Sequence, residues 1–274
     1  MLNALTVDVE EYFQVHAFKE VVGRENWDNY ESRVETSTSR ILDILAETET
    51  RATFFILGWI AERHPLLVQR IRDAGHEVAT HGYGHWLIYQ QTPEQFRSDL
   101  QRSLDIIQDI TGEKVLGFRA PSFSVTRHSL WALDVVQECG LLYDSSIYPA
   151  RPLVHNRYGL PGTPCAPYLI RPGLWEFPMT VVHWRGIDFP IGGGGWLRHY
   201  PYAFTRWGLR KVNAEGRPFI VYLHPWEVDP GQPRINGNRW RQFLHYHNLH
   251  KTEERLRALC QEFRFAPIRE VLGL

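Results

Sequence analysis

The chain has 274 residues, with 30 Lys and Arg against 31 Asp and Glu, so its net charge is close to zero. A chain of this length can bury one large core, and we expect a single domain over residues 1–274. The balanced charge and the lack of a long basic stretch argue against a nucleic acid partner. The three cysteines show no metal-ligand spacing, and an odd count is typical of a reducing compartment.

The start of the chain indicates where the protein works. The first strand pattern begins at about Asn3, which leaves no room for a signal peptide. No apolar run approaches the length needed to cross a bilayer. We therefore expect a cytoplasmic protein without a membrane span. The sequence does not indicate its oligomeric state.

Strand and helix patterns alternate through the first half. Apolar runs predict strands at residues 3–9, 52–57, 76–80, 117–120 and 141–144. Amphipathic periodicity, with Pro and Gly at the ends, predicts helices at residues 37–48, 65–75, 92–111 and 126–139. Repeated β-α units of this length predict a parallel α/β sheet, either a barrel or an open doubly wound sheet.

The regular pattern breaks at about residue 150, where a loop-rich elaboration begins. Strands are predicted at 175–182 and 219–224, and a last helix at 251–263. Four glycines, at 192–195, lack the spacing of a nucleotide-binding loop, and we interpret them as a close-approach or mobile loop. Trp and Tyr are frequent here. Most should lie in the core, but a few around a cleft, Trp196 among them, would suit stacking against sugar rings.

Two acidic residues lie at the end of the first predicted strand. Asp8 and Glu10 are two residues apart, so their side chains point to the same face while Val7 and Val9 pack behind them. This arrangement can bring one carboxylate to a metal ion and leave the other free as a base.

Two histidines follow the third predicted strand. His81 and His85 are separated by Gly-Tyr-Gly, which disfavours the helix on which zinc metalloproteases carry such a pair. We place them where a strand end runs into a loop. Two imidazoles and one carboxylate leave a coordination position open for water. Together with the acidic pair, they predict a metal site.

The remaining polar residues of interest also fall at predicted strand ends. In parallel α/β folds the functional groups gather at the carboxyl ends of the strands. The residues found there are Asp8, Glu10, His81, His85, Arg119, Asp144 and His224.

The ordered set resembles the NodB-type polysaccharide deacetylases, carbohydrate esterase family 4. Residues 6–10 resemble the first family motif, 81–85 the second, 119–123 the third, Asp144 with Ser145 the fourth, and Leu223-His224 the fifth. The family has a distorted (β/α) barrel and removes acetyl groups from N-acetylated sugars. The segment from Trp175 onward is similar to the subgroup associated with exopolysaccharide gene clusters and exosortase.

The resemblance implies a division of roles. Asp8 would be the base that activates the attacking water, and Arg119 would hold it ionised. His81 and His85 would bind the metal. His224 would be the acid that protonates the leaving amine, tuned by Asp144.

Other roles concern the metal and the acyl pocket. The second carboxylate of the usual Asp-Asp pair is replaced by Val9, so Glu10 is the natural metal ligand and Glu11 the fallback. Leu223 would line the acetyl pocket. Ser122 stands where an aromatic residue is usual and, with Phe123, would contact the substrate. The implied cofactor is one divalent metal, with Zn²⁺ first and Co²⁺, Ni²⁺ or Fe²⁺ as alternatives.

The expected partner is an N-acetylated glycan or lipid-linked saccharide, because a cytoplasmic enzyme meets such a precursor before export. Two alternatives stay open. Related barrels hydrolyse other C–N bonds, of the ureide or cyclic imide type. The other alternative is a barrel that binds a glycan without hydrolysing it. The acid–base pair argues against this alternative, because a binding protein does not need one.

Overall fold

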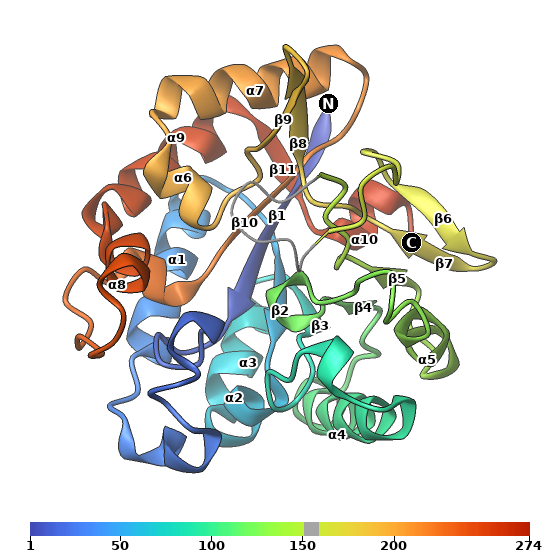
Figure 1. Cartoon of the computed structure of the whole chain (residues 1–274), viewed down its shortest axis with the longest axis vertical. Coiled ribbons are helices and arrows are strands. Elements are labelled where there is room, and N and C mark those ends of the chain that lie inside the picture. Colours follow the sequence, from blue (N-terminus) through green and yellow to red (C-terminus); the bar gives the residue numbers. More distant parts are fainter. Residues whose placement is uncertain (151–158) are drawn as a thin grey trace.

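The computed structural model describes residues 1–150 and 159–274, so residues 151–158 of the predicted elaboration lie outside the described residues. A curled sheet occupies the centre, and helices cover its outside (Figure 1). The described residues form a nine-stranded sheet. The parallel strands, in spatial order, are β10 (Ile220–Leu223), β1 (Leu2–Val9), β2 (Thr53–Ile56), β3 (Glu77–Thr80), β4 (Gly117–Phe118), β5 (Tyr143–Asp144) and β7 (Leu174–Glu176).

Three further elements complete the β-structure. β6 (Tyr168–Arg171) pairs antiparallel with β7. β11 (Arg264–Ala266) runs parallel to the start of β1. β8 (Val181–Trp184) and β9 (Ile187–Pro190) form a separate hairpin. The strand predicted over 175–182 is therefore two strands, because Pro178 lies between them and proline has no N–H to donate to a ladder.

The helices follow the strands they connect. The α-helices are α1 (Val34–Glu47), α2 (Gly58–Arg63), α3 (Pro65–Asp73), α4 (Pro93–Thr111), α5 (Ala132–Glu138), α6 (Gly195–His199), α7 (Tyr202–Ala214), α8 (Arg239–Tyr246), α9 (Thr252–Glu262) and α10 (Ile268–Leu272). The 3₁₀ turns are η1 (His16–Phe18), η2 (Arg24–Asn29), η3 (Ile88–Gln90), η4 (Pro121–Phe123), η5 (Pro225–Val228) and η6 (Leu249–Lys251). None of the described helices is long and apolar enough to span a bilayer.

The local sequence explains the longest helix. α4 begins with a capping box, in which the Thr92 side chain accepts from Gln95 N–H and the Gln95 side chain accepts from Thr92 N–H. It ends at Gly112, whose positive φ of 67° suits glycine. These two signals delimit the helix as the sequence predicted.

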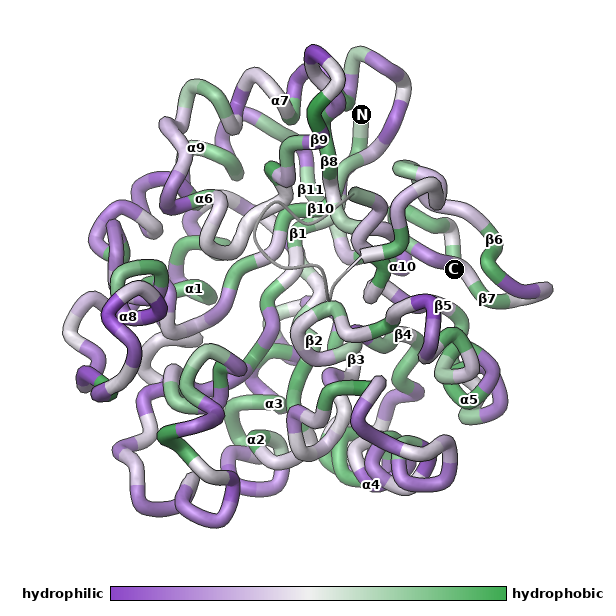
Figure 2. The backbone as a smooth tube through the Cα atoms, in the orientation of Figure 1, coloured by the Kyte–Doolittle hydropathy of each residue, from purple (hydrophilic) through white to green (hydrophobic). Residues whose placement is uncertain are grey.

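The alternation of side chains along the strands builds two cores. Leu5, Val7 and Val9 of β1 face outward and pack beneath the helices. Ala4 faces the interior of the curled sheet, where it packs with Phe55 and other inward residues. In Figure 2 the strands near the centre are largely hydrophobic, and hydrophilic stretches lie toward the periphery.

The curled sheet closes through single contacts between β10 and residues 180–193. Thr180 Oγ1 donates to the Ile220 carbonyl at 2.6 Å and accepts from Ile220 N–H at 2.8 Å. Gly193 forms an isolated parallel bridge with Tyr222. A Cβ on Gly193 would lie 1.9 Å from the Tyr222 carbonyl oxygen, so glycine is needed for this approach. The sequence prediction of an α/β fold with a distorted barrel is confirmed, and the glycine run is a close-approach segment.

Candidate active site

The two carboxylates of β1 lie where the sequence placed them. Asp8 and Glu10 are 2% and 3% exposed, and Val7 and Val9 are buried in the outer core behind them. Both acids act on the same neighbour, because the charges of Asp8 and Glu10 both favour protonation of His81. The carboxyl end of β1 therefore supplies two buried acids to one site.

The two histidines lie on the loop that follows β3. The Asp99 carboxylate of α4 accepts from Tyr83 N–H at 2.8 Å and from Gly84 N–H at 3.1 Å. Arg24 donates to the carbonyls of Gly84 and His85 at 2.5 and 2.7 Å. The backbone of this short, glycine-rich loop is thus held from two sides.

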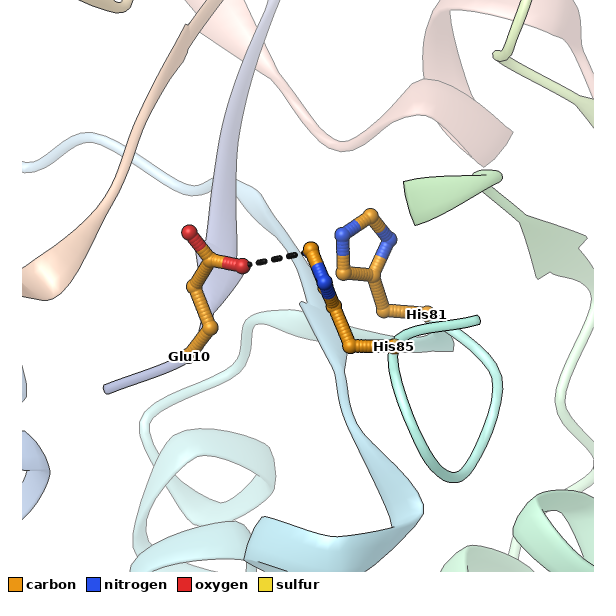
Figure 3. Close-up of side chains that lie close together, drawn as sticks. All are labelled: Glu10, His81 and His85. Atoms are coloured by element: carbon orange, nitrogen blue, oxygen red, sulfur yellow. Dashed lines mark ion pairs between the residues drawn. The ribbon is translucent and has the colours of Figure 1, made fainter. Parts of the chain in front are cut away.

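Glu10, His81 and His85 converge in a buried cluster (Figure 3). One ligand atom from each residue lies within 4.8 Å of the others, and Glu10 Oε2 is 2.8 Å from His85 Nε2. Nδ1 of His81 is 2.7 Å from the Arg119 carbonyl, which leaves Nε2 of that ring for a ligand. One carboxylate and two imidazoles form a donor set that fits zinc or a similar divalent ion.

The protonation states in the cluster also suit a cation. Burial alone would raise the pKa of Glu10, but the charge and hydrogen bond of His85, with the charges of His224 and His81, lower it to about 2. Burial lowers the pKa of His81 to about 4, and the charge of His85 acts in the same direction. At neutral pH Glu10 is an anion and His81 a neutral imidazole, the forms in which they bind metal.

Glu11 has a different task. Its carboxylate accepts from the N–H groups of Arg33 and Val34 at 3.1 and 3.2 Å and from Ser32 Oγ at 2.5 Å. These donors lie at the start of α1, so Glu11 caps that helix. Of the two candidates that the sequence offered for the carboxylate ligand, Glu10 is the one beside the histidines.

Asp8 forms a buried ion pair with Arg119, as expected. Arg119 Nη1 is 2.6 Å from Asp8 Oδ1 and 2.8 Å from Thr6 Oγ1, and Arg119 is fully buried. Its other nitrogens donate to the carbonyl and hydroxyl oxygens of Ser145 at 3.1 and 3.0 Å. The guanidinium is thereby fixed in place and holds the Asp8 carboxylate in one orientation.

His224 follows β10 and faces the same site. Its Nε2 lies 3.7 Å from Glu10 Oε1, and its Nδ1 lies 2.8 Å from Glu227 Oε2. Burial alone would lower the pKa of His224, but the hydrogen bond to Glu227 and the charges of Glu10, Glu227 and Asp8 raise it to about 9. His224 is therefore cationic at neutral pH and can donate a proton.

The expectation that Asp144 tunes His224 is wrong, because the His224 ring pairs with Glu227, and the charges that raise its pKa are those of Glu10, Glu227 and Asp8. Asp144 accepts from Ser146 N–H and Oγ and is in register with Glu176 on β7. Burial raises the pKa of both carboxyls, and the charge of Asp144 raises that of Glu176 further. Both carboxyls are thus harder to ionise than free ones, and Glu227 takes the place expected for Asp144.

The expected pocket residues separate into two groups. Phe123 contacts Tyr222 with ring centroids 5.0 Å apart, and Ser122 and Phe123 both have positive φ, at 54° and 52°. The prediction that Leu223 lines the acetyl pocket is wrong. Alternation along β10 turns its side chain away from the site and into the outer core. Tyr222 is on the site side instead, with its ring 5.7 Å from that of His224.

Trp196 lies at the edge of this region on α6. It is half-buried and stacks on Tyr200 at 5.2 Å between ring centroids. Trp196 is therefore one member of an aromatic pair at α6.

Sequence reasoning missed three residues of the site. Glu227 had a signal, because a Glu three residues after His224 with Pro225 between them has the spacing of a capping box, which the structure shows. Trp226 donates from Nε1 to Glu10 Oε1 at 3.2 Å. Arg198 donates from Nε to Glu227 Oε1 at 2.7 Å. Nothing in the local pattern assigns Trp226 or Arg198 to these contacts.

Comparison with known proteins relates the first half of the chain to a known family. Residues 26–143 match the family model of polysaccharide deacetylases, and residues 145–273 match a domain of unknown function, DUF3473. The peptidoglycan deacetylase-like protein FGM2 of Gibberella zeae is 33% identical over 198 residues, which is 72% of this chain and 50% of that protein. Residues 26–143 are therefore similar to a polysaccharide deacetylase domain. The chain spans about half the length of the curated relatives that it matches.

Solved structures share the fold of the deacetylase domain. One described as a polysaccharide deacetylase from Mycobacterium smegmatis has a TM-score of 0.65 at 22% identity, over 99% of this chain and 88% of that one. The Puue allantoinase has a TM-score of 0.61 at 15% identity, over 97% and 86%. At these identities the likeness shows the fold alone. Hence the barrel does not by itself decide which bond is hydrolysed.

Proposed function

We propose that this chain is a metal-dependent N-deacetylase, one catalytic domain over residues 1–274, that releases acetate from an N-acetylhexosamine of a polysaccharide or its lipid-linked precursor. One observation carries the proposal. A buried Glu-His-His cluster shares its strand end with an aspartate fixed by arginine, and a histidine held cationic by a glutamate lies 3.7 Å from its Glu10. This arrangement supplies a metal site, a base and an acid, which the hydrolysis of an amide requires.

Asp8 is the proposed base. Its Oδ1 is held by Arg119, so the carboxylate has a fixed direction. The water oxygen forms a bond to the acyl carbon as a water proton passes to Asp8. A rigid base costs no reorganisation when the reaction occurs.

His224 is the proposed acid. As the C–N bond breaks, Nε2 of His224 gives its proton to the nitrogen, which leaves as the free amine while the acyl group leaves as acetate. An amine is a poor leaving group, so this proton transfer matters more for an amide than for an ester. The Nδ1 side of the ring remains bound to Glu227.

The metal would be held by Glu10, His81 and His85, with Zn²⁺ as the first choice. A divalent ion there would polarise the acyl carbonyl and acidify water. Trp226 keeps one oxygen of Glu10 oriented. The chain's contribution is a set of three buried donors held close together.

The substrate class is drawn from the relatives. FGM2 is named for peptidoglycan deacetylase, which supports an N-acetylated glycan as the substrate. We further propose a precursor of an exopolysaccharide as the substrate, with Phe123, Ser122 and Trp196 lining the approach to the site. The assignments to the exosortase-associated subgroup and to the cytoplasm stay predictions from the sequence.

The experiment that tests this function is acetate release by the purified chain. Defined N-acetylglucosamine oligosaccharides and peptidoglycan fragments serve as substrates, and allantoin tests the ureide alternative. We expect acetate from at least one glycan, lost on chelation and in Asp8→Asn. Ureide hydrolysis without acetate release would move the function to the other class of C–N bond.

A further inference from the structure

A buried glutamate lies directly behind His224, and both of its oxygens are occupied. Glu227 is 1% exposed. Its Oε2 accepts from His224 N–H at 3.0 Å and lies 2.8 Å from His224 Nδ1. Its Oε1 accepts from Arg198 Nε at 2.7 Å. The carboxylate therefore fixes both the backbone and the ring of His224.

Arg198 fixes the glutamate in turn. It is 2% exposed, and its Nη1 lies within hydrogen-bond distance of the carbonyls of Leu244, His245 and His247, at 3.3, 2.9 and 2.8 Å. Among the described residues its acidic partner is Glu227. Such a pair costs desolvation energy that two well-packed apolar residues would avoid, so stability alone is a weak reason for it.

The glycine run explains how Arg198 reaches this position. A Cβ on Gly193 would lie 1.9 Å from the Tyr222 carbonyl oxygen, and one on Gly194 would lie 2.5 Å from the Tyr222 hydroxyl. Only a chain without side chains at these positions can lie so close to the end of β10. α6 begins at Gly195, so the run brings Arg198 beside the turn that follows His224.

We propose that Glu227 and Arg198 are positioning residues for the acid His224. Glu227 holds the proton on Nδ1 and so directs Nε2 to the reacting nitrogen, and Arg198 keeps Glu227 ionised and oriented. The region that matches the domain of unknown function, residues 145–273, then supplies the acid half of the site. This inference rests on the proposed function and deepens it.

The test compares two substrates that differ in whether their leaving group needs a proton. A residue that positions the acid should affect only the substrate that needs it, whereas a purely structural residue should affect both. Glu227→Gln and Arg198→Met are compared on an N-acetylated oligosaccharide and on p-nitrophenyl acetate, whose nitrophenolate leaves as a stable anion. Loss of an orienting partner should lower kcat on the amide about 10- to 100-fold. The ester rate and the metal content should stay within about threefold, since departure of the anion needs no acid.

Asp229→Asn is the matched control. Asp229 is also buried in this turn region, but its carboxylate pairs with Arg33 at 2.9 Å. It should leave the amide-to-ester ratio unchanged. An equal loss of both rates in Glu227→Gln, or no loss of either, would overturn the positioning role. A wild-type protein without amide activity would instead contradict the proposed function.

A spectroscopic measurement covers the case in which the variants do not fold. Long-range ¹H–¹⁵N correlation in the wild-type protein reports which ring nitrogens carry protons, and the spectrum of His224→Gln assigns the signal. We expect a protonated Nδ1 in a strong hydrogen bond. A ring of His224 with an unprotonated Nδ1 would overturn the proposal without any activity measurement.

Discussion

Substitutions of the adjacent residues Glu10 and Glu11 should affect metal binding differently. Glu10→Ala removes one of the three clustered donors, so the variant should lose most of the about one equivalent of metal expected for the wild-type protein. Glu11→Ala should keep the metal, because the Glu11 carboxylate is committed to the start of α1.

The cost of Glu11→Ala follows from its contacts. Two backbone N–H groups and the Ser32 hydroxyl lose their acceptor. Loss of a helix cap costs about 1–2 kcal/mol, and leaving buried donors unpaired costs about as much again at most, so we expect about 2 kcal/mol. For a chain of this size that lowers the melting temperature by about 5 °C.

The assay combines metal analysis with calorimetry. Metal per protein is measured by mass spectrometry after reconstitution, and melting is compared between the metal-free proteins so that lost metal does not contribute. Full metal content in Glu10→Ala together with loss of metal in Glu11→Ala would refute the assignment of the ligand.

Three further outcomes follow from the structure. Arg119→Met leaves Asp8 buried without its partner and should lower the free energy of unfolding by about 3–5 kcal/mol in urea titrations; a smaller loss than about 1 kcal/mol would contradict the buried pair. Asp144→Asn should keep the amide-to-ester ratio within about twofold of wild type, because Glu227, not Asp144, contacts His224. Burial lowers the pKa of His245 to about 3 and that of His76 to about 4. Between pH 6.5 and 4 the unfolded state therefore binds more protons than the folded state. As the pH is lowered through this range, the free energy of unfolding should fall by on the order of 3 kcal/mol for each histidine. Urea titrations at pH 7 and 5 check this, and His245→Phe should show a smaller difference than wild type.

The sequence predicted the parts of the site that depend on one strand end at a time. Asp8 and Glu10 follow from the two-residue period of a strand, and His81 and His85 from a strand that ends in a glycine-rich loop. Each relation spans a few residues, so periodicity and turn residues were enough. The parallel direction of the first strands followed from the alternation of strand and helix patterns.

The errors arose where the answer depends on distant segments. Asp144 and His224 both lie at strand ends, but Asp144 is bound by Ser146 and His224 by Glu227, and only the three-dimensional structure shows these contacts. Leu223 was assigned by motif position, whereas the alternation along β10 favours Tyr222. Arg198 reaches Glu227 because a glycine run lies against β10, a contact without a local pattern.

The most direct test of the account is acetate release from N-acetylated oligosaccharides by the purified chain, reconstituted with Zn²⁺ and compared with Asp8→Asn and with the chelated protein. We expect release by the reconstituted wild-type protein and none above background in the other two. A reconstituted protein that holds about one equivalent of metal but releases no acetate from any of the defined glycans would contradict the proposed activity.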